Sequence, residues 1–204
     1  MKTLIFGDSI ARWAFDHLWW RVERLKGAYL AWWQENYSHG IYNFSISGAT
    51  SRGLDKWIDQ SCSHFKTIIS DQIQIVINIW SNDAMGEETT DPFIAIDEFE
   101  NNIANAITVA KKYTNTVMIL WNVPIDENRT LPWKVGEYTF WMLNENQELY
   151  NQKLEAIAIS TWCRYISCRD RIDPTTDHDD WVHPNSSWHK KIFTHMKKIL
   201  DDLI

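Results

Sequence analysis

A serine and a histidine at opposite ends of the chain carry the residue types of nucleophilic catalysis. Gly7-Asp8-Ser9 directly follows an apolar run at residues 3–6. A serine on a strand-to-helix turn exposes its Oγ, and the glycine permits the tight turn. Asp180-Trp181-Val182-His183 precedes the last helical pattern. An aspartate three residues before a histidine can accept from imidazole Nδ1–H, which leaves Nε2 free to remove a serine proton.

Two further motifs could supply hydrogen-bond donors. Gly48 follows the apolar segment 41–46, and a glycine can offer an unobstructed backbone N–H to a ligand. Asn82 follows the run 73–80, where a side-chain amide can donate to an oxyanion. Each motif also has an ordinary structural interpretation: Ser9 as a helix N-cap, and Gly48 and Asn82-Asp83 as turn residues.

The segment before the last helix allows other interpretations. Asp177, His178, Asp179 and His183 could together bind a metal ion, or the acidic residues could form a solvated loop. No further cluster of ligand residue types occurs elsewhere in the sequence, which favours the serine–histidine interpretation over a metal site. Cys62, Cys163 and Cys168 form no CxxC pair, so neither a zinc site nor a disulfide framework is indicated.

Alternating strand and helix patterns must position these motifs. Apolar segments predict strands at residues 3–6, 41–46, 73–80, 116–121 and 164–167, each rich in apolar or β-branched residues. Apolar stripes at helical spacing predict helices at residues 22–32, 93–110, 143–159 and 188–203, the second beginning at an Asp91-Pro92 cap. This order predicts an α/β fold with a parallel sheet covered on both faces. Ligands of such sheets bind at the carboxyl ends of the strands, where all four motifs fall.

Composition narrows the class of protein. The 204 residues fit one domain, residues 1–204, and are long enough for a core without disulfide or metal staples. The net charge is −7 and there is no basic tail, so binding to nucleic acid is not expected. No apolar run reaches the roughly 18 residues that a membrane span needs. The apolar run at 3–6 is too short for a secretion signal, which predicts a cytoplasmic location.

Taken in chain order, the four motifs resemble the blocks of the SGNH, or GDSL-type, serine hydrolases. Gly7-Asp8-Ser9 matches the first block, Gly48 the second, Asn82-Asp83 the end of the third, and Asp180-x-x-His183 the last. The resemblance covers the whole chain. It implies a flavodoxin-like three-layer α/β/α sandwich with a five-stranded parallel sheet, and hydrolysis of esters or thioesters through an acyl-enzyme.

The resemblance also implies a role for each site residue. Ser9 is the nucleophile, His183 the general base and then acid, and Asp180 the residue that orients the histidine. The N–H groups of Ser9 and Gly48 and the side-chain amide of Asn82 form the oxyanion hole. No metal or organic cofactor is needed, and the partner is a small-molecule ester. The leading expectation is a lysophospholipase or short-chain esterase; the alternatives are a carbohydrate deacetylase or a catalytically impaired binding protein whose tryptophans stack on sugar rings.

Tryptophan is abundant and glycine is scarce, with 13 and 7 residues respectively. Against the family pattern, tryptophan stands where glycine is usual at positions 13, 19, 20, 80, 121, 181 and 188. We expect these side chains to crowd the cleft and to strain turns that need glycine. Because the codon UGA is read as glycine in some genetic codes and as tryptophan in others, the pattern also suggests a decoding mismatch.

Overall fold

The five expected strands pair into one parallel sheet in the order β2-β1-β3-β5-β8. The computed structural model describes residues 2–12, 41–68, 72–121, 124–178 and 182–201. The strands are β1 (Lys2–Gly7), β2 (Ile41–Asn43), β3 (Ile73–Asn78), β5 (Val117–Leu120) and β8 (Arg164–Ile166). All residues of β3 and β5 are buried, as a parallel sheet covered on both faces requires.

The strand order places a topological switch point at β1. The chain adds β2 on one side of β1 and then returns to add β3 on the other side. In a doubly wound sheet the connections leave this point in opposite directions, which opens a crevice at the carboxyl ends of the strands. The motifs that follow β1, β2 and β3 therefore lie at the same edge of the sheet.

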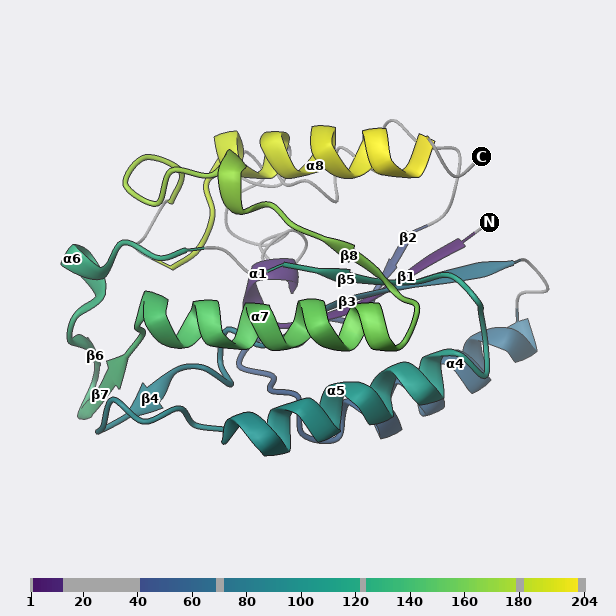
Figure 1. The fold of residues 1–204 in the computed structure, drawn as a ribbon, viewed down its shortest axis with the longest axis horizontal. Helices are drawn as coiled ribbons and strands as arrows, with labels where there is room; N and C mark the ends of the chain where they lie inside the picture. The colour runs from purple at the N-terminus through teal and green to yellow at the C-terminus, as the bar shows by residue number, and fades with distance from the viewer. Residues whose placement is uncertain (1, 13–40, 69–71, 122–123, 179–181, 202–204) are drawn as a thin grey trace.

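Helices cover both faces of the sheet (Figure 1). One face carries α4 (Leu54–Ile68), α5 (Ile96–Ala110) and α7 (Asn144–Ser160), and the other carries α8 (Ser186–Asp201). The remaining helical segments are short: α1 (Ser9–Arg12), α6 (Glu127–Thr130) and the 3₁₀ turn η2 (Arg169–Arg171). The architecture is the expected three-layer α/β/α sandwich. No helix within the described ranges has the length and apolar character to cross a bilayer.

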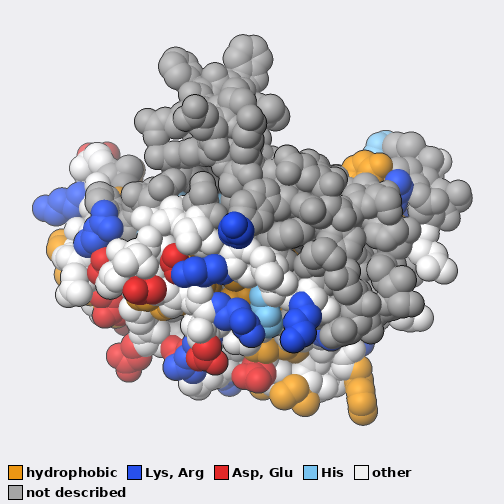
Figure 2. All heavy atoms as spheres, turned by 90° about the horizontal axis from the view of Figure 1, so that it is seen from above, with side chains coloured by type: hydrophobic (Ala, Val, Ile, Leu, Met, Phe, Trp, Pro, Cys, Tyr) orange, Lys and Arg blue, Asp and Glu red, His pale blue; other side chains and the backbone are white. Residues whose placement is uncertain are grey.

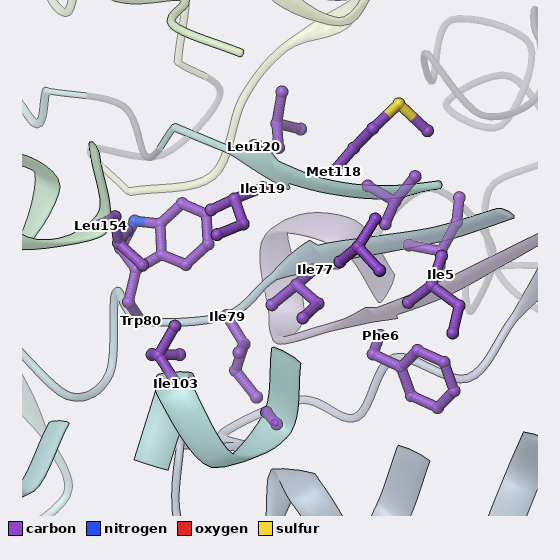
Figure 3. Close-up of a cluster of buried hydrophobic side chains, with 14 of the residues drawn as sticks. Ile5, Phe6, Ile77, Ile79, Trp80, Ile103, Met118, Ile119, Leu120 and Leu154 are labelled. Atoms are coloured by element: carbon purple, nitrogen blue, oxygen red, sulfur yellow. The ribbon is translucent and has the colours of Figure 1, made fainter. Parts of the chain in front are cut away.

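The core lies between the sheet and the helices. Trp80, which follows β3, is 1% exposed, and its indole lies beside Leu154 of α7 and Ile119 of β5 (Figure 3). Trp188, Ile192 and Met196 of α8 are also buried, as the apolar stripe of the last helix predicted. Burial of such side chains is the main favourable contribution to folding.

Some elements differ from those expected. Helix α5 begins at Ile96 rather than at residue 93, and Phe93 is 48% exposed instead of facing the core. The N–H groups of Phe93 and Ile94 donate to the carbonyls of Met85 and Asp83, so this segment is held by the loop after β3 and cannot join the helix. The helix expected at residues 22–32 lies outside the described residues.

A second, antiparallel sheet was not expected from the sequence. It consists of β4 (Gly86–Glu87), β6 (Trp133–Val135) and β7 (Tyr138–Trp141), in the order β4-β7-β6. Its strands have two to four residues, too few to show a periodic pattern. Figure 1 shows it at the same end of the molecule as α6.

Candidate active site

Ser9 lies at the carboxyl end of β1, on a turn that only glycine permits. A Cβ atom added to Gly7 would lie 2.5 Å from Cβ of Ala11 and 2.7 Å from the carbonyl oxygen of Asn78. Glycine is therefore required here by the close approach of β3 and α1, not by a positive φ angle. The turn leaves Ser9 half-buried as the first residue of α1.

Asp8 ties the turn that carries Ser9 to the end of β3. One carboxylate oxygen accepts the N–H of Ile10 at 2.9 Å, and the other accepts the hydroxyl of Ser81 at 2.8 Å. The side chain is fully buried, and this burial raises the pKa of Asp8 above its ordinary value. These bonds fix the position of the serine relative to the motif after β3.

His183 faces Ser9 across the sheet edge. Its Nε2 atom lies 3.2 Å from Oγ of Ser9, within hydrogen-bond reach of a general base and its nucleophile. The fold thus brings together two of the three residues expected to form the triad. Both side chains are half-buried, so the pair is partly shielded from water.

The segment that carries His183 is anchored on both sides. The N–H of Asn185 donates to the carbonyl of Asp177 at 2.9 Å, and His178 forms a β-bridge with Pro184. Val182 is 5% exposed and packs with a small apolar cluster that contains Ile125. Asp180 lies outside the described residues, so its role as the orienting carboxylate stays a prediction.

The residues of the alternative metal site have different partners. The Asp177 carboxylate accepts from Nζ of Lys191 at 2.5 Å and from the N–H of Asp173. Nδ1 of His178 lies 3.0 Å from the carbonyl oxygen of Pro174, while His183 faces Ser9. Asp179 lies outside the described residues. Within the described part of the chain, no three His, Cys, Asp or Glu side chains are grouped as metal ligands.

The two expected oxyanion donors beyond the nucleophile lie on neighbouring loops. Gly48 has a φ angle of +75°, and a Cβ atom there would meet nothing within 4 Å, so backbone conformation alone favours glycine. Nδ2 of Asn82 donates to the carbonyl of Ala49 at 2.9 Å. This bond places the amide of Asn82 against the loop of Gly48. An amide nitrogen has two hydrogens, so one remains for a ligand.

Asp83 forms a second connection between these two loops, a role that the sequence motifs did not indicate. Its carboxylate is fully buried and accepts the N–H of Ser51 through both oxygens, at 2.9 and 3.0 Å. Burial raises the pKa of Asp83 to about 7. The only sequence signal for this role is its place next to Asn82.

Trp80 and Trp188 lie in the core and do not fill a cleft. The indole of Trp80 points into the core, so the expectation that it crowds the substrate is wrong. Trp188 is 2% exposed and contacts the His189 ring edge-on at 5.0 Å. Positions 80, 121 and 188 do not have positive φ angles, so their backbones do not demand glycine. Positions 13, 19, 20 and 181 lie outside the described residues.

Two cavities lie elsewhere in the described part of the molecule. One, of about 350 Å³, includes Trp121, Gln147 and Arg169 in its lining. The other, of about 640 Å³, is lined by Arg171 and by Lys190 and Lys198 of α8, among others. Lys and Arg side chains gather on this face of the molecule (Figure 2). Neither cavity contains Ser9 or His183 in its lining.

Solved structures share this fold over its full length. A member of the lipolytic G-D-S-L family from Veillonella parvula has a TM-score of 0.72 at 18% identity, covering 98% of this chain and 97% of its own. A GDSL-like lipase from Bacteroides thetaiotaomicron has a TM-score of 0.69 at 18% identity, covering 100% and 89%. A variant of Axe2, an acetyl-xylooligosaccharide esterase from Geobacillus, has a TM-score of 0.67 at 18% identity, covering 97% and 92%. No protein-family model and no curated protein matches the sequence.

Proposed function

We propose that this chain, which has the fold of the GDSL-type hydrolases, is a serine hydrolase that cleaves carboxylic esters or thioesters. The observation that carries the proposal is the distance of 3.2 Å between Nε2 of His183 and Oγ of Ser9, at the switch point of the sheet. A serine hydroxyl is a weak nucleophile until a neighbouring base removes its proton. The proximity of His183 to Ser9 supports this role for the imidazole, and the fold is shared with a member of the lipolytic G-D-S-L family and with a GDSL-like lipase.

In the proposed reaction, Oγ of Ser9 attacks the carbonyl carbon while Nε2 of His183 takes its proton. The carbonyl oxygen becomes an oxyanion, which the N–H groups of Ser9 and Gly48 and the amide of Asn82 stabilise. The imidazolium then gives its proton to the leaving alkoxide or thiolate, and the acyl-enzyme remains. Water, activated by His183, releases the acid and restores Ser9. Asp180 accepts from the imidazole and holds its tautomer.

A carbohydrate deacetylase is the second candidate. It is supported by the similarity to Axe2, an esterase of acetylated xylooligosaccharides, which shares the fold over 97% of this chain. Its reaction needs the same Ser9 and His183 chemistry, so the two candidates differ only in the acyl and alcohol groups accepted. A lysophospholipase or short-chain esterase remains the leading assignment, because several GDSL neighbours are lipolytic proteins.

A fluorophosphonate probe tests the proposal, because it labels only serines that are activated as nucleophiles. We expect labelling of the wild type at Ser9 and hydrolysis of p-nitrophenyl acetate, with both lost in Ser9→Ala. Ser45→Ala is the matched control, since Ser45 is a buried serine beside the same sheet edge. Absence of labelling in a folded wild-type protein would reject the enzyme and favour the binding protein. A panel of acetylated sugars and longer acyl esters then separates the two candidates.

A further inference from the structure

The backbone at position 162 has a conformation that normally belongs to glycine. Helix α7 ends at Ser160, and Trp162 has a φ angle of +55°. The N–H of Trp162 donates to the carbonyl of Ile159 at 3.2 Å, and the N–H of Cys163 donates to that of Ala158 at 2.8 Å. These two bonds define a Schellman motif, with Trp162 at the left-handed position. A side chain with a Cβ atom lowers the stability of this conformation by roughly ten-fold in the equilibrium constant.

The indole of Trp162 gains little burial to offset this cost. The residue is 92% exposed, at the end of the sheet opposite to the carboxyl ends that carry Ser9. Trp57 and Trp133 differ, because each packs against a phenylalanine with 5.5 Å between ring centroids: Trp57 lies edge-on to Phe6, and Trp133 is tilted against Phe140. Neither the backbone conformation nor packing therefore favours tryptophan at this exposed, left-handed cap position.

One other described residue with a Cβ atom has a positive φ angle, but its side chain forms a hydrogen bond that stabilises the backbone. Glu88, with a φ angle of +55°, accepts the N–H of Thr139 through its carboxylate at 2.6 Å. That bond ties the residue to β7 and stabilises the strained backbone. Trp162 has no carboxylate to make such a bond, and its side chain is 92% exposed.

The composition agrees with the helix cap. The chain has 13 tryptophans and only 7 glycines. Nε1 of Trp80 is buried without a hydrogen-bond partner among the described residues, but the Trp80 ring packs in the core, so position 80 gives no structural argument for glycine.

We propose that position 162 is glycine in the natural protein, because the source organism reads UGA as glycine. Glycine at 162 removes the Cβ penalty from the helix cap. Trp57 and Trp133, which pack well, are native tryptophans.

The coding DNA decides the proposal. We expect TGA at codon 162, and TGG at codons 57 and 133. The tryptic peptide 154–164 of the protein isolated from its own organism should have the mass of a glycine at position 162. TGG at codon 162, or a tryptophan in that peptide, overturns the proposal.

Stability tests the structural premise separately, namely that a side chain at position 162 strains the helix cap. Trp162→Gly should raise the midpoint of urea denaturation, corresponding to a roughly ten-fold shift toward the folded state. Trp57→Gly is the matched control and should lower the midpoint, because it leaves a space beside Phe6. An unchanged or lower midpoint for Trp162→Gly counts against the proposal.

A different observation supports a positioning role for Asp83, and this inference rests on the proposed function. Ala49 and Ser51 lie one and three residues after Gly48, and each is bonded to one residue of the Asn82-Asp83 pair. Nδ2 of Asn102 in α5 donates to Oγ of Ser51 at 3.0 Å, so the loop is also tied to a helix. We infer that Asp83 holds the loop of Gly48 against Asn82, so that two oxyanion donors stay aligned.

Kinetics of Asp83 variants distinguish a loss of alignment of the oxyanion donors from a loss of folding. Asp83→Ala should lower kcat by ten-fold or more with little change in KM, because alignment matters most for the developing oxyanion. Asp83→Asn, whose amide oxygen can still accept the Ser51 N–H, should recover part of the loss. Asp59→Ala is the control, since Asp59 accepts from the Tyr113 hydroxyl on the helical side of the protein.

Hydrogen exchange separates this inference from the proposed function. Hydrogen exchange of the Ser51 N–H should accelerate in Asp83→Ala whether or not the wild type hydrolyses esters. An inactive wild type would therefore reject the proposed hydrolase activity, but not the bond from the Ser51 N–H to Asp83 that holds the loop. A folded Asp83→Ala protein with unchanged kcat and unchanged Ser51 exchange overturns the positioning role.

Discussion

Nε2 of His183 lies 3.2 Å from Oγ of Ser9, although the two residues are separated by 174 positions in the chain. Ser9 is held from below by β1 and by the Asp8–Ser81 bond, and His183 is held by the anchored segment before α8. The relationship thus joins the first strand to the last helix. Loss of either partner should remove the activated nucleophile without disturbing the core.

Ser9→Ala and His183→Ala should each lower the rate of ester hydrolysis by about 10⁴-fold or more, because a lone serine or a lone base cannot form the acyl-enzyme efficiently. Both side chains are only half-buried, so thermal stability should change little. Steady-state kinetics with p-nitrophenyl acetate checks the first statement and thermal unfolding the second. A variant that keeps a tenth of the activity would show that the pair is not the catalytic centre.

Asp180→Asn should lower kcat by up to about 10⁴-fold, because an asparagine favours the wrong imidazole tautomer. Asp179→Asn is the neighbouring control and should have a small effect. If Asp179→Asn were the more damaging substitution, the orienting carboxylate would be Asp179.

Asn82→Ala should lower kcat by about 10²–10³-fold with KM nearly unchanged, the effect expected when one oxyanion donor is lost. The bond from Asn82 to Ala49 uses only one amide hydrogen, which leaves the other for the substrate. Comparing kcat and KM for one ester in wild type and variant tests this role. An effect confined to KM would instead assign Asn82 to ground-state binding.

Stability should fall as the pH rises from about 4 to about 7. Burial raises the pKa of Asp83 to about 7, whereas an aspartate in the unfolded chain has its ordinary value near 4. In this window the folded protein keeps a proton that the unfolded chain has lost, so the free energy of unfolding decreases with pH and levels off above it. Asp8, whose pKa burial also raises, acts in the same direction.

Urea denaturation at several pH values measures this dependence. Asp83→Asn should reduce the slope, because an amide does not titrate, and the remaining slope belongs to Asp8 and other groups. Asp91→Asn, on an exposed residue, should leave the slope as in the wild type. An unchanged slope in Asp83→Asn would show that Asp83 is ionised in both states across this range.

Chelation should not change hydrolysis, since the proposed reaction uses only side chains and backbone donors. Asp177, His178 and His183, the described members of the alternative metal site, are each directed to a different partner. Activity measured before and after EDTA treatment checks this. Loss in EDTA and recovery with zinc would return the segment 177–183 to the metal interpretation.

The sequence by itself determined the class of fold and the main candidates for the site. Strands β1, β3 and β5 were identifiable because each contains an apolar run between polar segments, a signal that depends only on neighbouring residues. Ser9 and His183 were candidates for the same reason, since each follows or precedes a recognisable element. Local pattern is enough for such inferences because strand and helix periodicities repeat within a few residues.

Only the tertiary structure decided what depends on contacts between distant segments. The direction of the Trp80 indole, the exposure of Phe93 and the tie from Asp83 to Ser51 all result from packing or bonds across at least two elements. The left-handed backbone of Trp162 is set by how α7 joins β8, and no sequence pattern reveals a φ angle. The 3.2 Å distance of the proposed catalytic pair is of the same kind, because it exists only once the strand order places β1 at the switch point.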